Sequence, residues 1–249
     1  MSGPMSGPTS GPTSGPTNGP GVRTAAVVLA AGSGSRVGAE VNKVLLSLDG
    51  VPIIARSVRT VLEVAGVHRV VLVVRPGEQE AVAQAVAPHL GSHDLWVVDG
   101  GAQRHDSEWL ALNALAPDIE GGEIDVVAIH DGARPLAVPS LWDAVVGAAV
   151  EHGGAIPVVP GPRLSHRDGS LAPAGLVGVQ TPQAFRAAAL LEAHRRAAAD
   201  GFVGTDTAGV LERYTDLSVV GVPSTATNLK VTFAEDVGLA AALLSRRSG

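Results

Sequence analysis

The sequence feature that most constrains this chain is a short apolar run that ends in a glycine-rich turn. Residues 25–30 are apolar throughout, and Gly32-Ser33-Gly34-Ser35-Arg36 follows almost at once. A continuous apolar run of this length predicts a strand that is buried on both faces of a parallel sheet. Glycines after such a strand expose backbone N–H groups, which hold a phosphate when a helix follows. Arg36 and Lys43 add two cations, so the stretch predicts a loop that binds a nucleoside triphosphate.

The spacing of the glycines matches neither of the common nucleotide-binding fingerprints. Gly32, Gly34 and Gly38 miss the pattern G-x-G-x-x-G by one residue, and no glycine is followed by Lys-Ser or Lys-Thr. The alternative interpretation is a plain strand-to-helix turn that needs glycine only for its backbone dihedral angles. The two cations favour the phosphate-binding interpretation.

Apolar runs and helical patterns alternate along most of the chain. Strands are expected at residues 69–74, 95–98, 126–129 and 155–159, and helices at 53–64, 78–87, 107–115 and 139–152. Strict alternation with short connections predicts an α/β fold with a mostly parallel, doubly wound sheet. Ligands of such sheets bind beyond the carboxyl ends of the strands. The glycine-marked stretches at Gly32, Gly101 and Gly132 all follow such ends.

The alternation breaks after residue 159. Residues 160–173 are rich in proline and glycine at their start and show little periodicity, which predicts a protruding arm at about 160–175. Beyond the arm, residues 177–179 lead back to the body of the protein, and we expect a helix at 184–199, a short helix that Thr205-Asp206-Thr207 caps and that ends at Arg213, a strand at 217–222 and a helix at 234–245.

Residues 1–22 repeat Ser, Thr, Gly and Pro and offer almost no apolar side chain to bury. Ordering such a segment costs entropy without a compensating gain, so we expect a disordered leader and a single domain over 23–249. The leader lacks the basic start and apolar segment of a signal peptide. No apolar run reaches the roughly 18 residues of a membrane span. We therefore expect a cytoplasmic protein without a membrane partner.

Composition excludes several other classes of function. The net charge is −6, no block of Lys and Arg occurs, and aromatic residues make up 3% of the chain, so a general nucleic-acid binder is not expected. The chain has no cysteine, which excludes a disulfide scaffold and thiolate chemistry. A protein of this charge that binds phosphates must concentrate its few cations locally.

Three further polar residues are candidates for chemistry, each with a structural alternative. Asp131 follows a buried strand and could hold a metal that bridges phosphates, or it could cap a helix or pair with Arg134. Lys230 could reach from a strand end to a phosphate, or it could be a solvated surface lysine. Ser107 could bond a nucleobase or ribose, or it could cap the helix that starts there.

Five stretches, in this order, resemble the 2-C-methyl-D-erythritol 4-phosphate cytidylyltransferase family. They are 29–36 with Lys43, 99–101 with Arg104 and 106–107, 130–135, 180–183 and 228–232. The resemblance covers nearly everything from about Thr24 to Leu243. It implies a Rossmann-like nucleotidyltransferase fold and the transfer of CMP from CTP to 2-C-methyl-D-erythritol 4-phosphate, with release of pyrophosphate. It also implies Mg²⁺ as the cofactor and a homodimer whose arms exchange across the interface.

The resemblance assigns roles to the residues that match the family's motifs. It makes Arg36, Lys43 and Lys230 catalytic. It places the nucleotide against Ala30, Ala31, Gly32, Gly34, Gly101, Ser107 and Asp131, with Asp131 also facing the metal. It places the acceptor phosphate against Arg134, Thr181 and Lys230.

The arm departs from the family's pattern. The family carries Asp-Thr-x-Lys after the fifth strand, where this chain reads Pro160-Gly161-Pro162-Arg163, and an arginine where it has Pro173. Losing that arginine removes a bidentate phosphate contact, for which Arg163 or Arg167 could substitute. Three hypotheses follow: the same reaction with a shifted arm, a cytidylyltransferase for another phosphorylated polyol or sugar, or a paralogue that binds nucleotide without turning it over.

Overall fold

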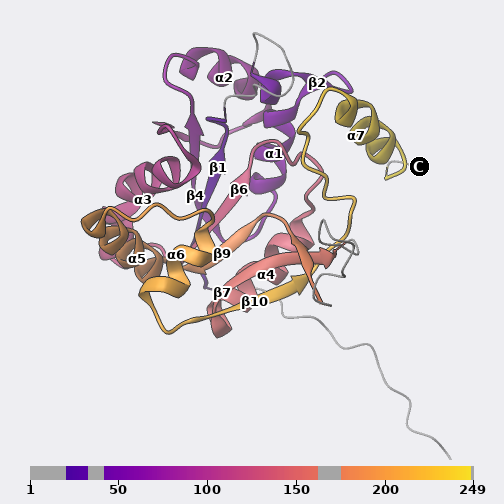
Figure 1. The fold of residues 1–249 in the computed structure, drawn as a ribbon. Helices are drawn as coiled ribbons and strands as arrows, with labels where there is room; N and C mark the ends of the chain where they lie inside the picture. Colours follow the sequence, from indigo (N-terminus) through magenta and orange to yellow (C-terminus); the bar gives the residue numbers. More distant parts are fainter. Residues whose placement is uncertain (1–20, 33–41, 162–174, 248–249) are drawn as a thin grey trace, which may run out of the picture.

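A computed structural model describes residues 21–32, 42–161 and 175–247 of the chain (Figure 1). Several predictions fall outside these described residues. They are the leader up to residue 20, Gly34 and Arg36 of the glycine-rich turn, and residues 162–174 of the arm with Arg163, Arg167 and Pro173.

Strands and helices alternate through the described chain, as expected. The strands are β1 (Thr24–Leu29), β2 (Ser47–Leu48), β3 (Val51–Pro52), β4 (Val67–Val74), β5 (Trp96–Asp99), β6 (Val126–Asp131), β7 (Gly153–Pro160), β8 (Val177–Val179), β9 (Gln183–Arg186) and β10 (Ser218–Pro223). The α-helices are α1 (Ile53–Leu62), α2 (Gln79–Val86), α3 (Arg104–Glu120), α4 (Pro139–His152), α5 (Ala187–Asp200), α6 (Thr207–Tyr214) and α7 (Glu235–Ser245), with 3₁₀ turns η2 (Lys43–Leu45) and η3 (Ala87–His89).

Within the described residues, eight strands form one sheet: seven lie in the order β10-β7-β9-β6-β1-β4-β5, and β8 pairs with β7. Strands β5, β4, β1 and β6 run parallel, as do β7 and β10, whereas β9 is antiparallel to both of its neighbours. The chain leaves β1 toward β4 on one side and reaches β6 on the other. The carboxyl ends of β1 and β6 therefore flank the point where the strand order reverses, which is where such sheets bind ligands.

Helices cover both faces of the sheet. The alternate residues Ala26 and Val28 of β1 pack with α1, α2 and α4, whereas Ala25 and Val27 pack with α3, α5 and α6. Both sets are buried because a central parallel strand has an apolar layer on each side. The prediction of a mostly parallel, doubly wound sheet is confirmed.

The predicted helix at 184–199 is wrong at its start, because residues 183–186 form β9 instead. This short strand pairs with β6 and β7 and closes the gap between two halves of the sheet. Its four residues carry no strand signal of their own, and the tertiary pairing overrides the helix preference of the alanines that follow. The helix α5 then begins at Ala187.

A second element that the sequence reasoning missed is the hairpin of β2 and β3. Asp49 and Gly50 form its two-residue turn with φ values of 51° and 75°. An Asp-Gly pair between apolar residues is a strong hairpin signal, so the hairpin could have been predicted. Helix α7 packs against this hairpin in a small apolar cluster of Leu48, Ile53, Leu136, Val231 and Ala240 (Figure 1).

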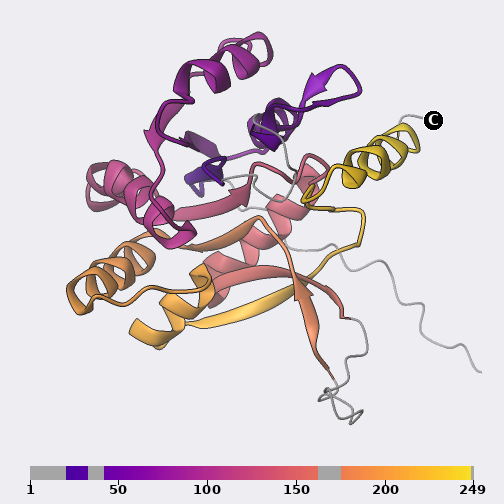
Figure 2. The same cartoon turned by 45° about the horizontal axis from the view of Figure 1, so that its top comes forward.

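The base of the predicted arm is a strand pair. Val158 of β7 lies opposite Val179 of β8, and Pro160 lies opposite Val177. This pair projects beyond the body of the sheet, as Figure 2 shows. Among the described residues no helix is both long enough and apolar enough to cross a membrane.

Candidate active site

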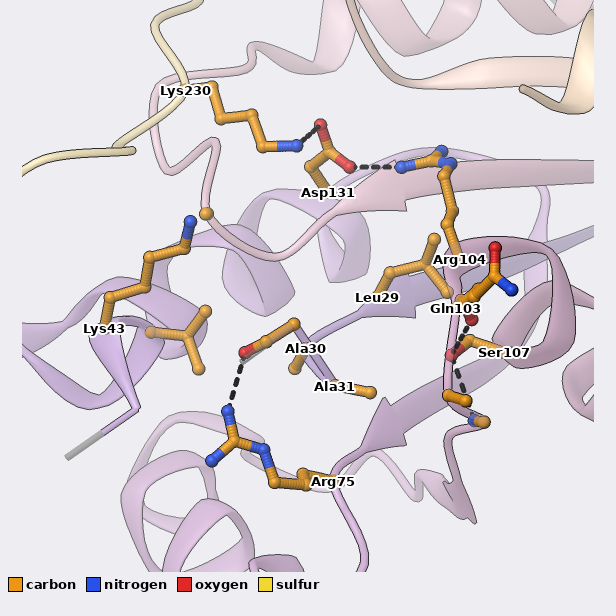
Figure 3. Close-up of a pocket in the computed structure, with 15 residues that line it drawn as sticks. Leu29, Ala30, Ala31, Lys43, Arg75, Gln103, Arg104, Ser107, Asp131 and Lys230 are labelled. Carbon is orange, nitrogen blue, oxygen red and sulfur yellow. Dashed lines mark hydrogen bonds and ion pairs between the residues drawn. The ribbon is translucent and has the colours of Figure 1, made fainter. Parts of the chain in front are cut away.

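A pocket of about 470 Å³ lies beyond the carboxyl ends of β1, β4, β5 and β6. Its described lining includes Ala30, Ala31 and Gly32 after β1, Gly101 and Ser107 after β5, and Asp131 at the end of β6. Lys43, Arg75, Arg104 and Lys230 supply four cations from four parts of the chain (Figure 3). Asp131 is the one acidic residue among the described lining residues, so the pocket is cationic in a protein whose net charge is −6.

The end of β1 is held from both sides. The N–H of Ala30 donates to the carbonyl of Val73 at 2.7 Å, which extends the pairing with β4. Asn42 Nδ2 donates to the carbonyl of Ala30 at 3.0 Å, and Asn42 Oδ1 accepts from the N–H of Val44 at 3.3 Å. Asn42 thereby caps the 3₁₀ turn that begins with Lys43 and fixes this lysine beside the strand end.

The turn between β5 and α3 is pressed closely against β1. A Cβ built on Gly100 would collide with the Cβ of Ala31, so only glycine allows this approach. The Ser107 hydroxyl accepts from the N–H of Gly101 and donates to the carbonyl of Gln103, both at 3.1 Å. Ser107 is therefore not the helix cap: α3 begins at Arg104, and Gln103 with Asp106 forms a capping box.

Asp131 gathers the cations at one end of the pocket. Its Oδ1 pairs with Arg104 Nη1 at 2.6 Å, and its Oδ2 pairs with Lys230 Nζ at 3.0 Å and with Arg134 Nε at 3.2 Å. The Asp131 side chain is 8% exposed, whereas Lys230 is 40% exposed. Figure 3 shows the carboxylate between the ends of Arg104 and Lys230. The structure thus confirms that Asp131 pairs with Arg134.

The charges around Asp131 decide its ionisation. Burial alone would raise the pKa of this carboxyl, but Arg104, Lys230 and Arg134 outweigh burial and hold the pKa well below its usual range. Burial also lowers the pKa of the Arg134 guanidinium, and Asp131 opposes that effect. Asp131 is therefore ionised at neutral pH.

Arg104 has a second carboxylate partner behind the pocket. Its Nε donates to Glu108 Oε1 at 2.7 Å, and the same oxygen accepts from the Thr207 hydroxyl at 2.8 Å. The Glu108 side chain is 1% exposed. Burial acts to lower the pKa of Arg104, but the two carboxylates outweigh burial and raise it. The guanidinium is thus fixed between a pocket carboxylate and a buried one.

Thr181 holds the end of β6 in place rather than lining the described pocket. Its hydroxyl accepts from the N–H of Asp131 at 2.9 Å and bonds His130 Nδ1 at 3.0 Å. His130 Nε2 lies 3.2 Å from the carbonyl of Arg134, which can only accept, so the proton sits on Nε2 and Nδ1 accepts from Thr181. Burial lowers the pKa of His130 to about 4, which keeps the ring neutral.

Lys230 lies in a loop, so the prediction that it stands at a strand end is wrong. The N–H of Val231 donates to the carbonyl of Ala133 at 2.8 Å, which fastens this loop beside β6. Asn228 adds side-chain bonds to Gln180 at 3.1 Å and to the carbonyl of Thr181 at 2.9 Å. These contacts hold the loop in place, so that Lys230 lines the pocket without being part of a strand.

Most of the predicted site residues come together in this pocket. Its lining includes the following predicted residues: Ala30, Ala31, Gly32, Lys43, Gly101, Ser107, Asp131 and Lys230. Arg134 and Thr181 do not line it, although both contact Asp131. Gly34 and Arg36 lie outside the described residues. Which ligand each residue contacts stays a prediction.

Two cations of the pocket were not among the predicted site residues. Arg75 directly follows β4, and Arg104 opens α3 after β5. Both stand at the carboxyl ends of parallel strands, so the general rule for ligand sites in such sheets could have found them.

The described side chains do not fit a metal ion held by the protein itself. Magnesium in proteins is typically bound by one or two carboxylates together with substrate phosphates. In the described lining the one carboxylate is Asp131, and both of its oxygens pair with cations. No group of three His, Cys, Asp or Glu that could hold a metal occurs in the described part of the chain. The prediction that Asp131 contacts a metal would require it to release a cation first.

Comparisons with known proteins point to one family. The model of the family described as "IspD: 2-C-methyl-D-erythritol 4-phosphate cytidylyltransferase" matches residues 24–246. The 2-C-methyl-D-erythritol 4-phosphate cytidylyltransferase of Pelotomaculum thermopropionicum is 40% identical over 235 residues, which cover 91% of this chain and 96% of that protein. The protein of the same name from Shouchella clausii is 36% identical over 229 residues, with 90% and 97% covered.

Solved structures agree. The 4-diphosphocytidyl-2C-methyl-D-erythritol synthase of Anaerococcus prevotii superposes with a TM-score of 0.75 at 25% identity, and 90% of this chain and 99% of that one are covered. The 2-C-methyl-D-erythritol 4-phosphate cytidylyltransferase of Thermus thermophilus gives 0.70 at 26% identity, with 88% and 98% covered. The family model and these relatives each cover about nine-tenths of the chain, which therefore belongs to the 2-C-methyl-D-erythritol 4-phosphate cytidylyltransferase family.

Proposed function

We propose that the chain transfers CMP from CTP to 2-C-methyl-D-erythritol 4-phosphate and releases pyrophosphate. The observation that carries this proposal is the cationic pocket beyond β1, β4, β5 and β6, in a chain that belongs to this enzyme family. Its four described cations suit a ligand with several phosphates. A volume of about 470 Å³ is within the range of pockets that hold small ligands.

The nucleotide fits between the end of β1 and the start of α3. The backbone at Ala31 and Gly32, with Lys43 beside it, suits the phosphates. Gly101 and Ser107 suit the cytosine and ribose, because both line the pocket where the turn after β5 approaches Ala31 closely. Arg36 adds a further cation in the proposal, although it lies outside the described residues.

The acceptor fits at the Asp131 end, where Lys230 and Arg134 lie. An oxygen of the acceptor phosphate attacks the α-phosphorus of CTP, a new P–O bond forms, and the bond to the leaving pyrophosphate breaks on the opposite side. A phosphate oxygen is already a nucleophile, so no general base is needed. Catalysis then consists of positioning and of neutralising the charge that develops on the phosphates.

Asp131 organises the cations for this step. It holds Arg104 and Lys230 on its two oxygens, so both charges are oriented before substrate binds. Such preorganised charges stabilise a transition state without reorganisation at the moment of reaction. We propose Mg²⁺ as the divalent ion that accompanies the triphosphate, held chiefly by the phosphate oxygens.

A homodimer and a cytoplasmic location complete the proposal. The exposed side chains Val177 and Val179 of β8, 50% and 46% exposed, support a partner at the arm. These two residues alternate along the strand and therefore share a face. A second copy of the chain would cover this apolar face.

One observation favours a different acceptor as the second candidate. Pro160 and Gly161 occupy positions at which the resemblance expects polar acceptor-binding residues, and Pro160 instead pairs with Val177 of β8. Neither side chain can donate to a phosphate. Another phosphorylated polyol or sugar that needs fewer contacts from the arm is therefore the alternative acceptor.

Nucleotide preference tests the first half of the proposal. Pyrophosphate release is measured with 2-C-methyl-D-erythritol 4-phosphate and, in turn, CTP, UTP, ATP and GTP. We expect CTP to give the highest kcat/KM. Equal turnover of all four nucleotides would show that the stretch around Gly101 and Ser107 does not recognise cytosine.

A further inference from the structure

Arg75 is a pocket cation to which neither the family's motifs nor the sequence analysis assigns a role. It follows the last residue of β4 directly, and β4 is the neighbour of β1 in the sheet. Its side chain lines the pocket and is 33% exposed. Because carboxyl ends of adjacent parallel strands meet at one edge, Arg75 lies beside the residues that follow β1.

Two bonds fix the guanidinium in this place. Nη1 pairs with Glu78 Oε1 at 2.9 Å. Nη2 donates to the carbonyl of Gly32 at 3.0 Å, which is the dashed line drawn from Arg75 in Figure 3. The other oxygen of Glu78 accepts from Asn42 Nδ2 at 2.6 Å. Arg75 is therefore tied to both described edges of the glycine-rich turn, Gly32 on one side and Asn42 on the other.

These bonds leave donors for a ligand. A guanidinium has five N–H donors, and the two bonds use one on Nη1 and one on Nη2. Glu78 is not part of the described pocket lining, so its charge does not occupy the space that a ligand would fill. Arg75 differs in this from Arg104 and Lys230, whose carboxylate partner Asp131 lies inside the pocket.

The in-line geometry of the proposed displacement determines which phosphates of the nucleotide would lie near Arg75. In the proposed function the acceptor phosphate lies by Lys230 and Arg134, at the Asp131 end. In-line displacement requires the leaving pyrophosphate on the opposite side of the α-phosphorus. Figure 3 shows Arg75 on the far side of the β1 end from Asp131 and Lys230. The β- and γ-phosphates would therefore extend toward Arg75.

We propose that Arg75 binds the terminal phosphates of the nucleoside triphosphate and, after the reaction, the pyrophosphate. This inference rests on the proposed function, because it requires a triphosphate in this pocket. Arg75 thus distinguishes a triphosphate from the corresponding monophosphate and holds the leaving group in line.

The test compares dissociation constants of CTP, CMP and inorganic pyrophosphate for the full chain, measured by calorimetry at one ionic strength. Arg75→Gln removes the charge but keeps a side-chain donor for the Gly32 carbonyl, and Arg75→Lys keeps the charge. The matched control is Arg69→Gln, because Arg69 lies on β4, the strand that Arg75 follows, and pairs with Asp118 outside the pocket.

We expect Arg75→Gln to raise the Kd of CTP and of pyrophosphate about tenfold, the low end for a lost charge-assisted contact at a partly exposed side chain. CMP binding should stay unchanged, Arg75→Lys should restore most of the CTP affinity, and Arg69→Gln should behave as wild type. Unchanged CTP binding in Arg75→Gln, or equal losses for CTP and CMP, would overturn the role of Arg75 alone. A wild-type protein that binds CTP no tighter than CMP would overturn the proposed triphosphate site as well.

Discussion

At the scale of single residues, Asp131 is the centre of the site. Sequence reasoning left its role open between a metal ligand, a helix cap and a partner of Arg134, and the structure pairs it with Arg134 and with two further cations, Arg104 and Lys230. Arg104 and Lys230 come from distant parts of the chain, so no local pattern could reveal that they meet on one carboxylate. The ion pair of Lys230 with Asp131 depends on the loop at 228–232, which is bonded beside the end of β6 through Val231 and Ala133.

The first prediction concerns Asp131→Asn, which leaves Arg134, Arg104 and Lys230 without their shared anion. Removing one partner of a buried ion pair costs about 3 kcal/mol or more. The phosphates of CTP would replace the lost charge, so we expect the loss of thermal stability to shrink when CTP saturates the protein. Thermal unfolding with and without CTP measures this.

The control for that prediction is Asp118→Asn, which removes the partner of Arg69 outside the pocket. Its effect on stability should not depend on CTP. A loss of stability in Asp131→Asn that grows when CTP is present would instead mean that Asp131 binds the nucleotide or a metal directly.

The second prediction concerns Lys43, which the cap by Asn42 fixes beside the end of β1. If its charge acts mainly on the transition state, Lys43→Ala slows turnover by roughly 10²-fold and leaves the melting temperature nearly unchanged. The same is expected of Arg36→Ala. Steady-state kinetics and thermal unfolding of each variant provide the check, and a large drop in melting temperature would favour a purely structural role.

At the scale of elements, sequence patterns predicted what is local and continuous. The buried strands β1, β4 and β6 and the helix α4 are present where apolar runs and helical spacing placed them. The strand β9 was missed because its four residues become a strand only by pairing with β6 and β7. The hairpin of β2 and β3 was missed although Asp49-Gly50 signals it.

The third prediction concerns the junction of β6 with the segment that carries Thr181. Burial lowers the pKa of His130 from 6.5 to about 4, so the unfolded chain binds a proton more readily than the folded one. This contribution to stability is complete above about pH 6.5 and is lost as the pH falls toward 4. At pH 5 we expect a loss of about 2 kcal/mol from this residue.

Urea unfolding of the wild type and of His130→Gln at pH 7.5, 6 and 5 isolates this contribution. The variant should be less stable at pH 7.5, because its bonds to Thr181 and the Arg134 carbonyl are disturbed, but its stability should fall less steeply with pH. Parallel pH profiles for the two proteins would show that His130 does not titrate in this range.

At the scale of the whole molecule, the fourth prediction concerns assembly. The apolar face that Val177 and Val179 form at the arm should lie between two copies of the chain. We expect sedimentation to give a dimer for the wild type and a monomer for the double variant Val177→Lys, Val179→Lys. Val97→Lys is the matched control, because Val97 is similarly exposed, at 44%, but lies on β5 at the opposite end of the sheet. A double variant that remains dimeric would place the interface elsewhere.

The glycine-marked stretches after the predicted strands allowed the site to be located from sequence, because the carboxyl ends of parallel strands share one edge. Which side chains bond to one another inside the site could not be predicted from the same pattern. Thr181 illustrates the difference: its motif predicted contact with the acceptor, which stays a prediction, but gave no sign that its hydroxyl bonds His130 and the backbone N–H of Asp131.

The most direct test of the account is pyrophosphate release from CTP across a panel of phosphorylated polyols and sugars, with the cytidylylated product identified by mass. The account predicts that 2-C-methyl-D-erythritol 4-phosphate gives the highest kcat/KM and yields its CMP adduct. Efficient turnover of a different acceptor, with none of 2-C-methyl-D-erythritol 4-phosphate, would contradict it.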